Sequence, residues 1–292
     1  LLDSSSLIEA IKQSSPNEIY HLASQSFVGA SFEQPIGTGN ITGLGVARVL
    51  EAVRGFDAQI KLYQASTSEL YGNSEKERQD EMTPFNPRSP YAVAKLYGCM
   101  MARIYRDAYG MFVCNGILFN HESPLRGLEF VTRKISNGVA KISLGLQKKL
   151  ALGNLDATRD WGYAPEYVES MYMMMQSDHA DDYVIATGES HSVREFVEKA
   201  FEYAGLNWQD HIVIDPKLKR PLETEKLCGD YSKAKLQLGW NPKTTFEELV
   251  EIMIKSDLER WKLWQKGERF PWDAPLYPSE DKIVSSKYRI DR

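Results

Sequence analysis

Two hydrophobic periods alternate along the first 120 residues of the chain. Short apolar runs with β propensity stand at 18–23, 60–63 and 112–119. Between them lie longer segments with helical spacing of their apolar positions, at about 1–13, 38–54 and 90–109. Strands separated by helices of this length predict a parallel sheet with right-handed crossovers. Such sheets bind ligands beyond the carboxyl ends of their strands, so we expect the functional residues there.

The alternation continues beyond residue 120 with shorter strands. Ser192 and Glu195 have the spacing of a capping box at the start of one helix. We expect one domain at 1–125 and a second, mainly at 126–292, with a strand near 183–187 returning to the first. The pattern predicts helices at about 130–144, 165–176, 192–204 and 246–266, and strands at 149–153 and 183–188.

Composition narrows the class of protein. A chain of 292 residues, 42% hydrophobic and 26% charged, is typical of a soluble globular protein with one large or two modest domains. No apolar run approaches the roughly 20 residues that span a bilayer, and no signal peptide precedes the first helix. We therefore expect a cytoplasmic protein without a membrane partner.

The net charge, the cysteines and the histidines argue against a nucleic-acid-binding, a disulfide-rich and a metal-binding protein. The net charge of −5 argues against nonspecific nucleic-acid binding, although a local arginine cluster can still hold a diphosphate. The three cysteines form no CxxC pair, which predicts reduced, mostly buried thiols. The five histidines lack metal-ligand spacing, so no metal is expected.

The candidate chemistry lies between Gln64 and Lys95. Tyr91 and Lys95 are four residues apart in the helix that begins after Ser89 and Pro90, so both side chains share one face. A nearby ammonium favours the phenolate, and we expect it to lower the pKa of Tyr91 from its ordinary value of about 10. Glu69, in the polar segment after the strand at 60–63, supplies a second proton carrier.

A tyrosine and a lysine at this spacing also occur by chance in many helices, so the pair alone identifies no family. Together with the Ser/Thr segment that follows a strand and the alternation of strands and helices, it resembles the extended short-chain dehydrogenase/reductase family. The resemblance extends from Leu1 to about Lys266. Within the family, the segments Ser66 to Gly72 and Asn120 to Pro124 are most similar to those of nucleotide-sugar 4,6-dehydratases that act on GDP-mannose. The resemblance implies an α/β fold with a Rossmann-like doubly wound parallel sheet and a smaller, partly interleaved C-terminal α/β substrate domain.

The resemblance also implies a reaction. Such dehydratases use a nicotinamide cofactor to take a hydride from C4 of the hexose, lose water across C5 and C6, and return the hydride to C6. It implies NADP as cofactor, with NAD not excluded, and GDP-mannose as substrate. Tyr91 would be the base, Glu69 the acid/base at C5 and Thr67 the donor to the C4 oxygen. Lys95 would lower the pKa of Tyr91 and bind the nicotinamide ribose.

Glu69 discriminates between the dehydratase and its relatives. Related epimerases and reductases keep the hydroxyl, tyrosine and lysine but lack a carboxylate at this position, because they eliminate no water. An epimerase or reductase of the same fold remains the alternative reading. The glucose-nucleotide dehydratases usually have Asp-Glu after the threonine, where this chain has Ser68-Glu69.

The resemblance further implies ligand contacts. Arg159 and Arg220 are suited to binding a diphosphate, and Glu223 to accepting hydrogen bonds from the ribose hydroxyls. The family commonly has Gly-Ala where Ala23-Ser24 stand and a tyrosine near Gly37, so those contacts differ here. The implied cofactor contacts are Leu1, Leu22, Ala23, Ser24, Gln25, Ser26, Tyr91, Lys95, His121 and Arg126; the implied substrate contacts are Asn120, Arg133, Gly153, Asn154, Arg159, Arg220 and Glu223.

One expected motif is missing. A dinucleotide-binding sheet normally begins with a strand and a glycine-rich turn, and this chain contains no G-x-G-x-x-G. We therefore expect that the first segment of the dinucleotide-binding domain is absent from this sequence, which leaves a catalytically silent binding or assembly subunit as a third reading.

Family members associate through the helices near 38–54 and 90–109, so a homodimer or homotetramer is expected. Residues 270–292 predict no function.

Overall fold

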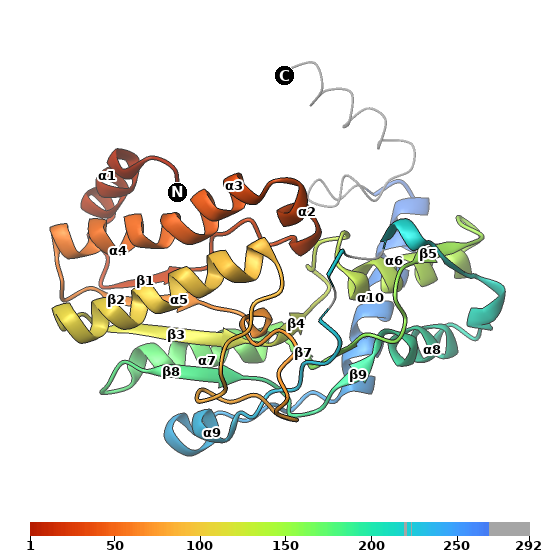
Figure 1. The fold of residues 1–292 in the computed structure, drawn as a ribbon. Coiled ribbons are helices and arrows are strands. Elements are labelled where there is room, and N and C mark those ends of the chain that lie inside the picture. Colours follow the sequence, from red (N-terminus) through yellow and green to blue (C-terminus); the bar gives the residue numbers. More distant parts are fainter. Residues whose placement is uncertain (219–220, 223, 269–292) are drawn as a thin grey trace.

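The structure is a computed structural model that describes residues 1–218, 221–222 and 224–268. Its centre, within these residues, is a four-stranded parallel sheet with the strand order β1-β2-β3-β8 (Figure 1). This sheet confirms the predicted α/β fold class. The strands are β1 (Glu18–His21), β2 (Lys61–Ala65), β3 (Val113–Leu118) and β8 (Asp182–Ile185).

Helices cover both faces of the sheet, and the strand residues alternate between the two sides. Leu62 packs toward the helices α4 and α5, whereas the neighbouring Tyr63 packs toward α7. One apolar side of each of α4, α5 and α7 is buried against these faces. The helices on the first face are α1 (Ser4–Ser14), α4 (Leu44–Phe56) and α5 (Pro90–Tyr109), and the helix on the second is α7 (Ala164–Gln176).

The helix predicted at 38–54 is divided into three parts. It consists of α3 (Pro35–Thr38), a π-helical turn at Gly39–Gly43, and α4. A Cβ at Gly43 would lie 3.4 Å from the Ala94 carbonyl oxygen of α5, so the small residue allows close approach of the two helices. The low helix propensity of the glycines explains why the regular α-helix begins only after them.

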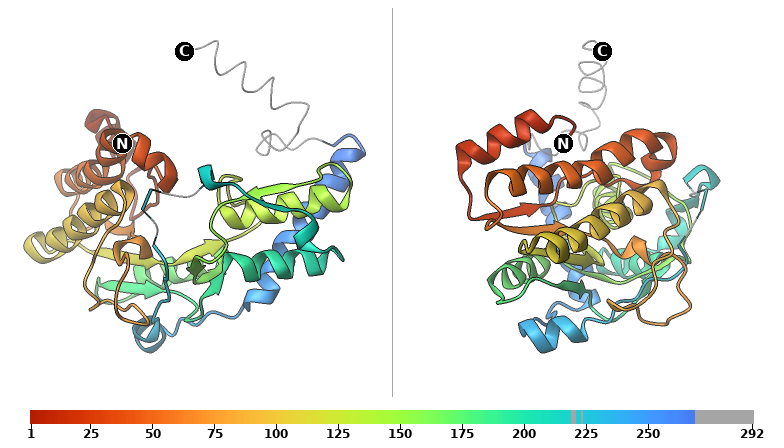
Figure 2. Two further views of the ribbon diagram at one scale, coloured as in Figure 1. Left: turned by 45° about the vertical axis from the view of Figure 1, so that its right-hand side comes forward. Right: turned by 60° about the vertical axis from the view of Figure 1, so that its left-hand side comes forward.

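A second group of elements lies beyond the carboxyl ends of the strands, as the two views of Figure 2 show. Its core is built around Ile135, Phe196, Phe246 and Met253, with Trp161 facing them. The elements of this group are α6 (Val131–Ser143), β5 (Leu150–Leu152), α8 (Val193–Tyr203), β10 (Ile212–Ile214) and α10 (Phe246–Gln265). Shorter elements connect it to the sheet: α2 (Val28–Glu33), β4 (Asn120–Glu122), β6 (Thr158–Arg159), β7 (Trp161–Tyr163), β9 (His191–Ser192) and α9 (Ser232–Leu238).

The buried carboxylate of Asp160 joins segments that are distant in the sequence. Its Oδ1 accepts hydrogen bonds from the backbone amide and hydroxyl of Thr187, at 2.8 and 2.7 Å. Its Oδ2 accepts from the amides of Gly188 and Gly229, at 2.9 and 3.1 Å. Burial raises the pKa of Asp160 to about 6 against these hydrogen bonds. The end of β8, the β6–β7 link and the segment near 229 are therefore fastened to one side chain.

Local sequence signals place most helix starts correctly. Asp3, Ser89, Ser192 and Thr245 each cap the helix that follows them, and the predicted capping box of Ser192 with Glu195 is present. The short helix α9 and the strand β10 were not predicted. Among the described residues, no helix is both long and apolar enough to cross a membrane.

Candidate functional site

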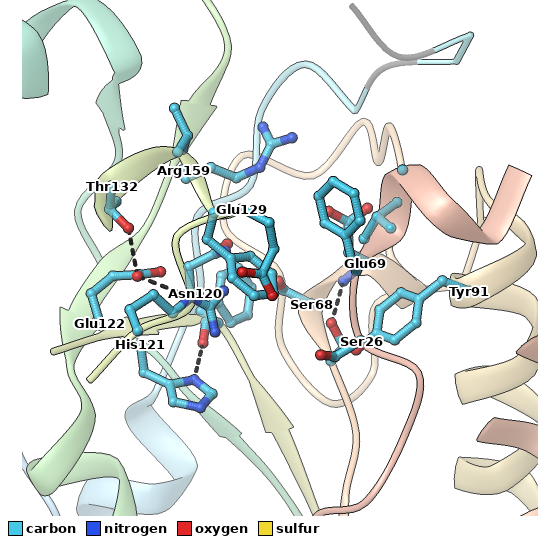
Figure 3. Close-up of a pocket in the computed structure, with 18 of the residues that line it drawn as sticks. Ser26, Ser68, Glu69, Tyr91, Asn120, His121, Glu122, Glu129, Thr132 and Arg159 are labelled. Carbon is cyan, nitrogen blue, oxygen red and sulfur yellow. Dashed lines mark hydrogen bonds and ion pairs between the residues drawn. The ribbon is translucent and has the colours of Figure 1, made fainter. Parts of the chain in front are cut away.

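A cavity of about 850 Å³ opens where the sheet meets the second group of elements. One wall comes from the carboxyl ends of β1, β2 and β3 and from the first turns of α5, and the other from α6, β5 and β6. Figure 3 shows Ser26, Glu69 and Tyr91 on one side and Glu122, Thr132 and Arg159 on the other. The strand-end polar segments predicted from the sequence therefore meet in one cavity.

Thr67 and Glu69 are positioned by a single turn of 3-10 helix at Ser68–Leu70. The Thr67 side chain caps this turn, and its Oγ1 accepts a hydrogen bond from the Glu69 amide at 3.3 Å. The cap directs both side chains into the cavity beside Tyr91. Thr224 reaches the same carboxylate from a distant segment, its Oγ1 donating to Glu69 Oε2 at 3.4 Å.

Tyr91 stands in the first turn of α5, where the Ser89 cap and Pro90 fix the start of the helix. Burial raises the pKa of Tyr91 to about 12, the Thr67 hydroxyl opposes this through a hydrogen bond, and the Glu69 carboxylate adds to it. The interaction with both residues shows that Thr67, Glu69 and Tyr91 form one cluster. The expected lowering of the Tyr91 pKa is therefore wrong for this structure, because desolvation outweighs the nearby cations.

Lys95 lies one turn further along α5 and is also buried, with 5% of its surface exposed. Its Nζ donates to the Ala65 carbonyl at 2.8 Å and lies 5.9 Å from the centre of the Tyr91 ring. Burial lowers the pKa of Lys95 to about 8. The lysine thus links α5 to the end of β2, and its ammonium points at a backbone oxygen instead of the phenol.

The β4 segment brings a histidine and a buried carboxylate to the cavity. His121 Nδ1 donates to the Phe119 carbonyl at 2.9 Å, and burial lowers the pKa of His121 to about 4, so the ring is neutral. Glu122 accepts a hydrogen bond from Thr132 at 2.6 Å and pairs with Arg126 at 3.2 Å. Burial raises the pKa of Glu122, and Arg126 opposes this. Arg126 also stacks on the Phe130 ring at 3.6 Å.

Most of the site residues predicted from the sequence line this cavity. Four predicted residues, Leu1, Ala23, Gln25 and Arg133, are not among its lining residues. Arg220 and Glu223 lie outside the described residues. The predicted residues that the cavity brings together are Leu22, Ser24, Ser26, Thr67, Glu69, Tyr91, Lys95, Asn120, His121, Arg126, Gly153, Asn154 and Arg159.

The residues left out have other partners. Leu1 packs on Gly45, and its carbonyl accepts from Arg48 Nη1 at 3.0 Å. The Gln25 amide donates to Thr42 Oγ1 at 3.0 Å, which ties the β1 loop to the π-helical turn. These interactions turn both predicted cofactor residues away from the cavity.

Arg133 requires a correction. It is 1% exposed, and its Nη2 pairs with the fully buried Asp257 at 2.8 Å. The next residue, Lys134, lines the cavity instead, and burial lowers its pKa against the attraction of Asp215. Adjacent helix positions differ by about 100° in direction, and here Arg133 turns toward Asp257 of α10 while Lys134 faces the cavity.

Lys134, Glu122 and Thr132 are among the polar cavity residues that sequence reasoning missed, as are Glu33, Glu129 and Lys217. A signal for Lys134 was available, because Ile135, Val139 and Ile142 mark the buried side of α6. No sequence signal reveals Glu122 and Thr132 as a pair, since their hydrogen bond joins β4 to α6 across a loop.

Comparison with known proteins of similar sequence indicates one enzyme family. A family described as GDP-mannose 4,6 dehydratase matches residues 1–253. The chain belongs to this family. GDP-mannose 4,6 dehydratase 1 of Arabidopsis thaliana is 51% identical over 263 residues, covering 89% of this chain and 73% of that protein. The Homo sapiens GDP-mannose 4,6 dehydratase is 49% identical over 278 residues, covering 89% of this chain and 75% of that protein.

Solved structures share the fold. RMD from Pseudomonas aeruginosa, complexed with NADPH, has a TM-score of 0.81 at 24% identity, covering 89% of this chain and 87% of that chain. A dTDP-glucose 4,6-dehydratase from Bacillus anthracis, in complex with NAD, has a TM-score of 0.77 at 24% identity, covering 91% of this chain and 80% of that chain. At this identity the likeness carries the fold alone, whereas the family membership rests on the sequence match of the GDP-mannose 4,6 dehydratases.

Proposed function

We propose that this chain is a GDP-mannose 4,6-dehydratase, a hydro-lyase that converts GDP-mannose into GDP-4-dehydro-6-deoxy-mannose and water. The observation that carries the proposal is the Glu69 carboxylate on the same cavity wall as Thr67 and Tyr91. A reaction that only moves a hydride needs one base, whereas loss of water also needs a carboxylate near C5. The relatives at about 50% identity support the substrate.

The residues lining the cavity fit a dinucleotide such as NADP. Lys95 and the serines Ser24 and Ser26 offer donors at the strand ends, and Arg126 offers a guanidinium for a phosphate. We infer that these groups hold the cofactor, with neutral His121 beside them. The chemistry that such a cofactor supplies when bound is the temporary removal of a hydride from the sugar and its return two carbons away.

The acid and base roles are assigned to this chain's own residues. Tyr91 is assigned as the base that takes the proton of the C4 hydroxyl, a role that requires its phenolate and therefore a lower pKa than the value of about 12 that burial gives it in the protein alone. Thr67 is assigned as the donor of a hydrogen bond to the same oxygen. Glu69 removes the C5 proton and delivers it to the departing C6 hydroxyl, so that water leaves. The proton that Tyr91 took from the C4 hydroxyl is then returned to C5 through Glu69, which restores both residues. Lys95 anchors the first turns of α5 to the end of β2 and thereby holds the Tyr91 ring against the cavity.

The far wall of the cavity suits the nucleotide part of the substrate. Arg159 and Lys134 line it, and two cations at this position match the charge of a diphosphate. Asn120, Gly153 and Asn154 lie along the same wall. A Cβ at Gly153 would lie 2.8 Å from the Leu218 carbonyl oxygen, so the bare backbone keeps this wall narrow. Substrate contacts by Arg220 and Glu223 remain predictions.

The test compares the wild-type protein with Glu69→Gln on GDP-mannose. Wild type is expected to form the 4-keto sugar, and the variant to lose about 10²- to 10⁴-fold in kcat, which is the usual contribution of a general acid or base. Glu198→Gln, an exposed position on α8 outside the cavity lining, is the matched control. A product that keeps its C6 hydroxyl, or net consumption of NADPH, would favour the epimerase or reductase; no turnover and no bound nucleotide would favour the silent subunit.

We also infer that the chain is a homodimer or homotetramer that associates through α4 and α5. Along α5 an apolar stripe is exposed at helical spacing, formed by Val93, Tyr97, Met100 and Ile104 with 40–55% of each side chain accessible. Leu44 of α4 adds to it at 46%. Light scattering at micromolar concentration is expected to give at least a dimer, and Ile104→Asp to give a monomer. A monomeric wild type would contradict this inference.

We further infer a cytoplasmic location. The three cysteines of the sequence, Cys99, Cys114 and Cys228, are buried free thiols, which is typical of a reducing compartment. Fractionation of cells that express the natural protein is expected to recover it with cytoplasmic enzymes. Recovery from an oxidising compartment would contradict this.

A further inference from the structure

A buried ion pair joins α6 to α10 behind the cavity. Arg133 Nε donates to both carboxylate oxygens of Asp257, at 3.0 and 2.9 Å, and Nη2 pairs with Oδ1 at 2.8 Å. Ser136 donates to the second carboxylate oxygen at 2.6 Å. Neither charged side chain is more than 1% exposed. The Nε hydrogen bond shared by both carboxylate oxygens and the Nη2 ion pair together orient the guanidinium.

The remaining nitrogen of that guanidinium is directed at the loop between β4 and α6. Arg133 Nη1 donates to the Arg126 carbonyl at 3.0 Å and also to the Pro124 carbonyl. Arg260 of α10 approaches the same Pro124 oxygen at 3.4 Å. The carbonyls of a cavity loop are therefore held by donors whose own position depends on the C-terminal helix.

This loop carries a residue of the cavity. The Arg126 side chain lines the cavity, pairs with Glu122 at 3.2 Å and stacks on Phe130 at 3.6 Å. Its carbonyl is the group that Arg133 holds. Fixing the backbone at residue 126 fixes the point from which its guanidinium reaches into the cavity.

We propose that Arg133, oriented by Asp257, is a positioning residue that holds Arg126 in place for binding an anionic group of the dinucleotide. The proposal rests on the proposed function for the identity of that ligand. Arg133 itself touches neither the cavity nor a ligand in it; it acts through the loop backbone.

A simple stability role would not need this arrangement. Arg133 contacts Asp257 through the Nε hydrogen bonds and the Nη2 ion pair, and neither contact requires the loop. Two backbone carbonyls of the loop nevertheless converge on Nη1. The loop between β4 and α6 therefore depends on this nitrogen for its closest fixed contacts to the α6–α10 core.

The test uses a double variant that removes the pair as a unit, Arg133→Met with Asp257→Asn. Neither Arg133 nor Asp257 is left as a lone buried charge, so the fold is expected to persist. Arg260, whose Nη1 lies 3.6 Å from Asp257 Oδ1, keeps its approach to the Pro124 carbonyl. Hydrogen exchange at amides 125–130 of the full chain is expected to rise at least tenfold, and the Kd for NADPH to rise about tenfold. The control, Lys199→Met with Glu202→Gln, removes an isolated ion pair on α8 away from the cavity lining and should leave both quantities unchanged.

A double-mutant cycle separates positioning from general loosening. If Arg133 acts through Arg126, Arg126→Met should weaken NADPH binding in the wild type but add little in the double variant. If the increases in the Kd for NADPH caused by Arg126→Met and by the double variant multiply when combined, the proposal is overturned. Unchanged hydrogen exchange at amides 125–130 would also overturn it. Should the double variant fail to fold, Ser136→Ala, which removes one donor to Asp257, is expected to give the same pattern at smaller size, and its absence there would equally overturn it.

The exchange measurement needs neither cofactor nor sugar, so it distinguishes two failures. Faster loop exchange together with no turnover of GDP-mannose by wild type would refute the proposed function and leave the positioning role standing. Normal turnover of GDP-mannose by wild type, with unchanged loop exchange in the double variant, would refute the positioning role and leave the proposed function standing.

Discussion

Replacing Lys95 with methionine is expected to stabilise the protein at neutral pH while abolishing its activity. The ammonium of Lys95 is buried, and burial lowers its pKa from the usual 10.5 to about 8. A lysine whose charged form is disfavoured in the folded state lowers the stability of that state wherever the unfolded chain is protonated. Methionine has a similar volume and carries no charge.

The size of the effect follows from two opposing contributions. The fall in the pKa from 10.5 to about 8 corresponds to roughly 3 kcal/mol at about 1.4 kcal/mol per tenfold change. Against this, the variant loses the hydrogen bond from Lys95 Nζ to the buried Ala65 carbonyl, which costs about 1–2 kcal/mol. The net gain at pH 7 is about 1–2 kcal/mol, or a few degrees in Tm.

The sign of the difference is expected to change with pH. Between about pH 8 and 10.5 the unfolded chain binds the proton that folded Lys95 has lost, so the stability of wild type rises with pH across this window. Above 10.5 the burial penalty has vanished, and only the lost hydrogen bond separates the two proteins. The variant is then less stable by about 1–2 kcal/mol, with the crossing at about pH 9.5.

Urea denaturation of both proteins at pH 7 and pH 10.5 measures the difference, because all other titrating groups cancel between them. Turnover of GDP-mannose at pH 7 is measured in parallel. A stability difference that is the same at both pH values would refute the reasoning, since it would mean that Lys95 keeps its usual pKa in the folded protein. A variant that remains fully active would refute the proposed role of Lys95 instead.

Two further predictions concern stability. Ser89→Ala should cost about 1 kcal/mol, because the Ser89 hydroxyl accepts the Ala92 amide at 3.0 Å at the start of α5; urea midpoints measure the loss, and Ser89→Thr should restore most of it. Tyr63→Phe should be neutral or stabilising by up to about 1 kcal/mol, because its buried hydroxyl has no hydrogen-bond partner among the described residues. Gly116→Ala would place a Cβ 2.1 Å from that hydroxyl oxygen, so its destabilisation, about 1–3 kcal/mol or more, should be smaller in the Tyr63→Phe background; equal losses in both backgrounds would contradict the contact.

The sequence was informative wherever the cause of a structure is local. The start of α5 follows from Ser89 and Pro90 within the same helical turn, and the start of α8 from the capping box of Ser192 with Glu195. Strand-end polar residues were also placed correctly, because parallel strands all deliver their carboxyl ends to one edge of the sheet. These rules need only neighbouring residues and the chain direction.

Arg133 shows where such reasoning stops. The sequence presents two adjacent cations, Arg133 and Lys134, in a helix that borders the cavity. The choice between them is made by Asp257, which lies 124 residues further along the chain. A helical period indicates which positions are buried, but not that an arginine occupies a buried position because a carboxylate meets it there.

The pKa of Tyr91 was predicted wrongly for a related reason. Spacing along α5 correctly placed a cation near the phenol, but it gave no measure of how much water the cavity wall excludes. Burial removes solvation from both side chains, raising the pKa of Tyr91 and lowering that of Lys95. Their interaction is therefore weaker than the loss of solvation, an outcome that depends on packing from several distant segments.

Both corrections, and the role of Asp160, point to one principle of construction. Asp160 and Lys95 are buried charged groups whose hydrogen bonds run largely to backbone atoms of segments distant in sequence. Arg133 connects the backbone of the nearby loop to the side chain of the distant Asp257. Apolar contacts tolerate small sliding movements, whereas a charge-assisted hydrogen bond to a carbonyl or amide weakens steeply as its angle and length depart from the optimum. Asp160 therefore fastens the β6–β7 segment to the end of β8, whereas Lys95 and Arg133 each fix one side of the cavity. Substitutions that spare the apolar core but remove one of them should change ligand affinity more than they change the denaturation midpoint.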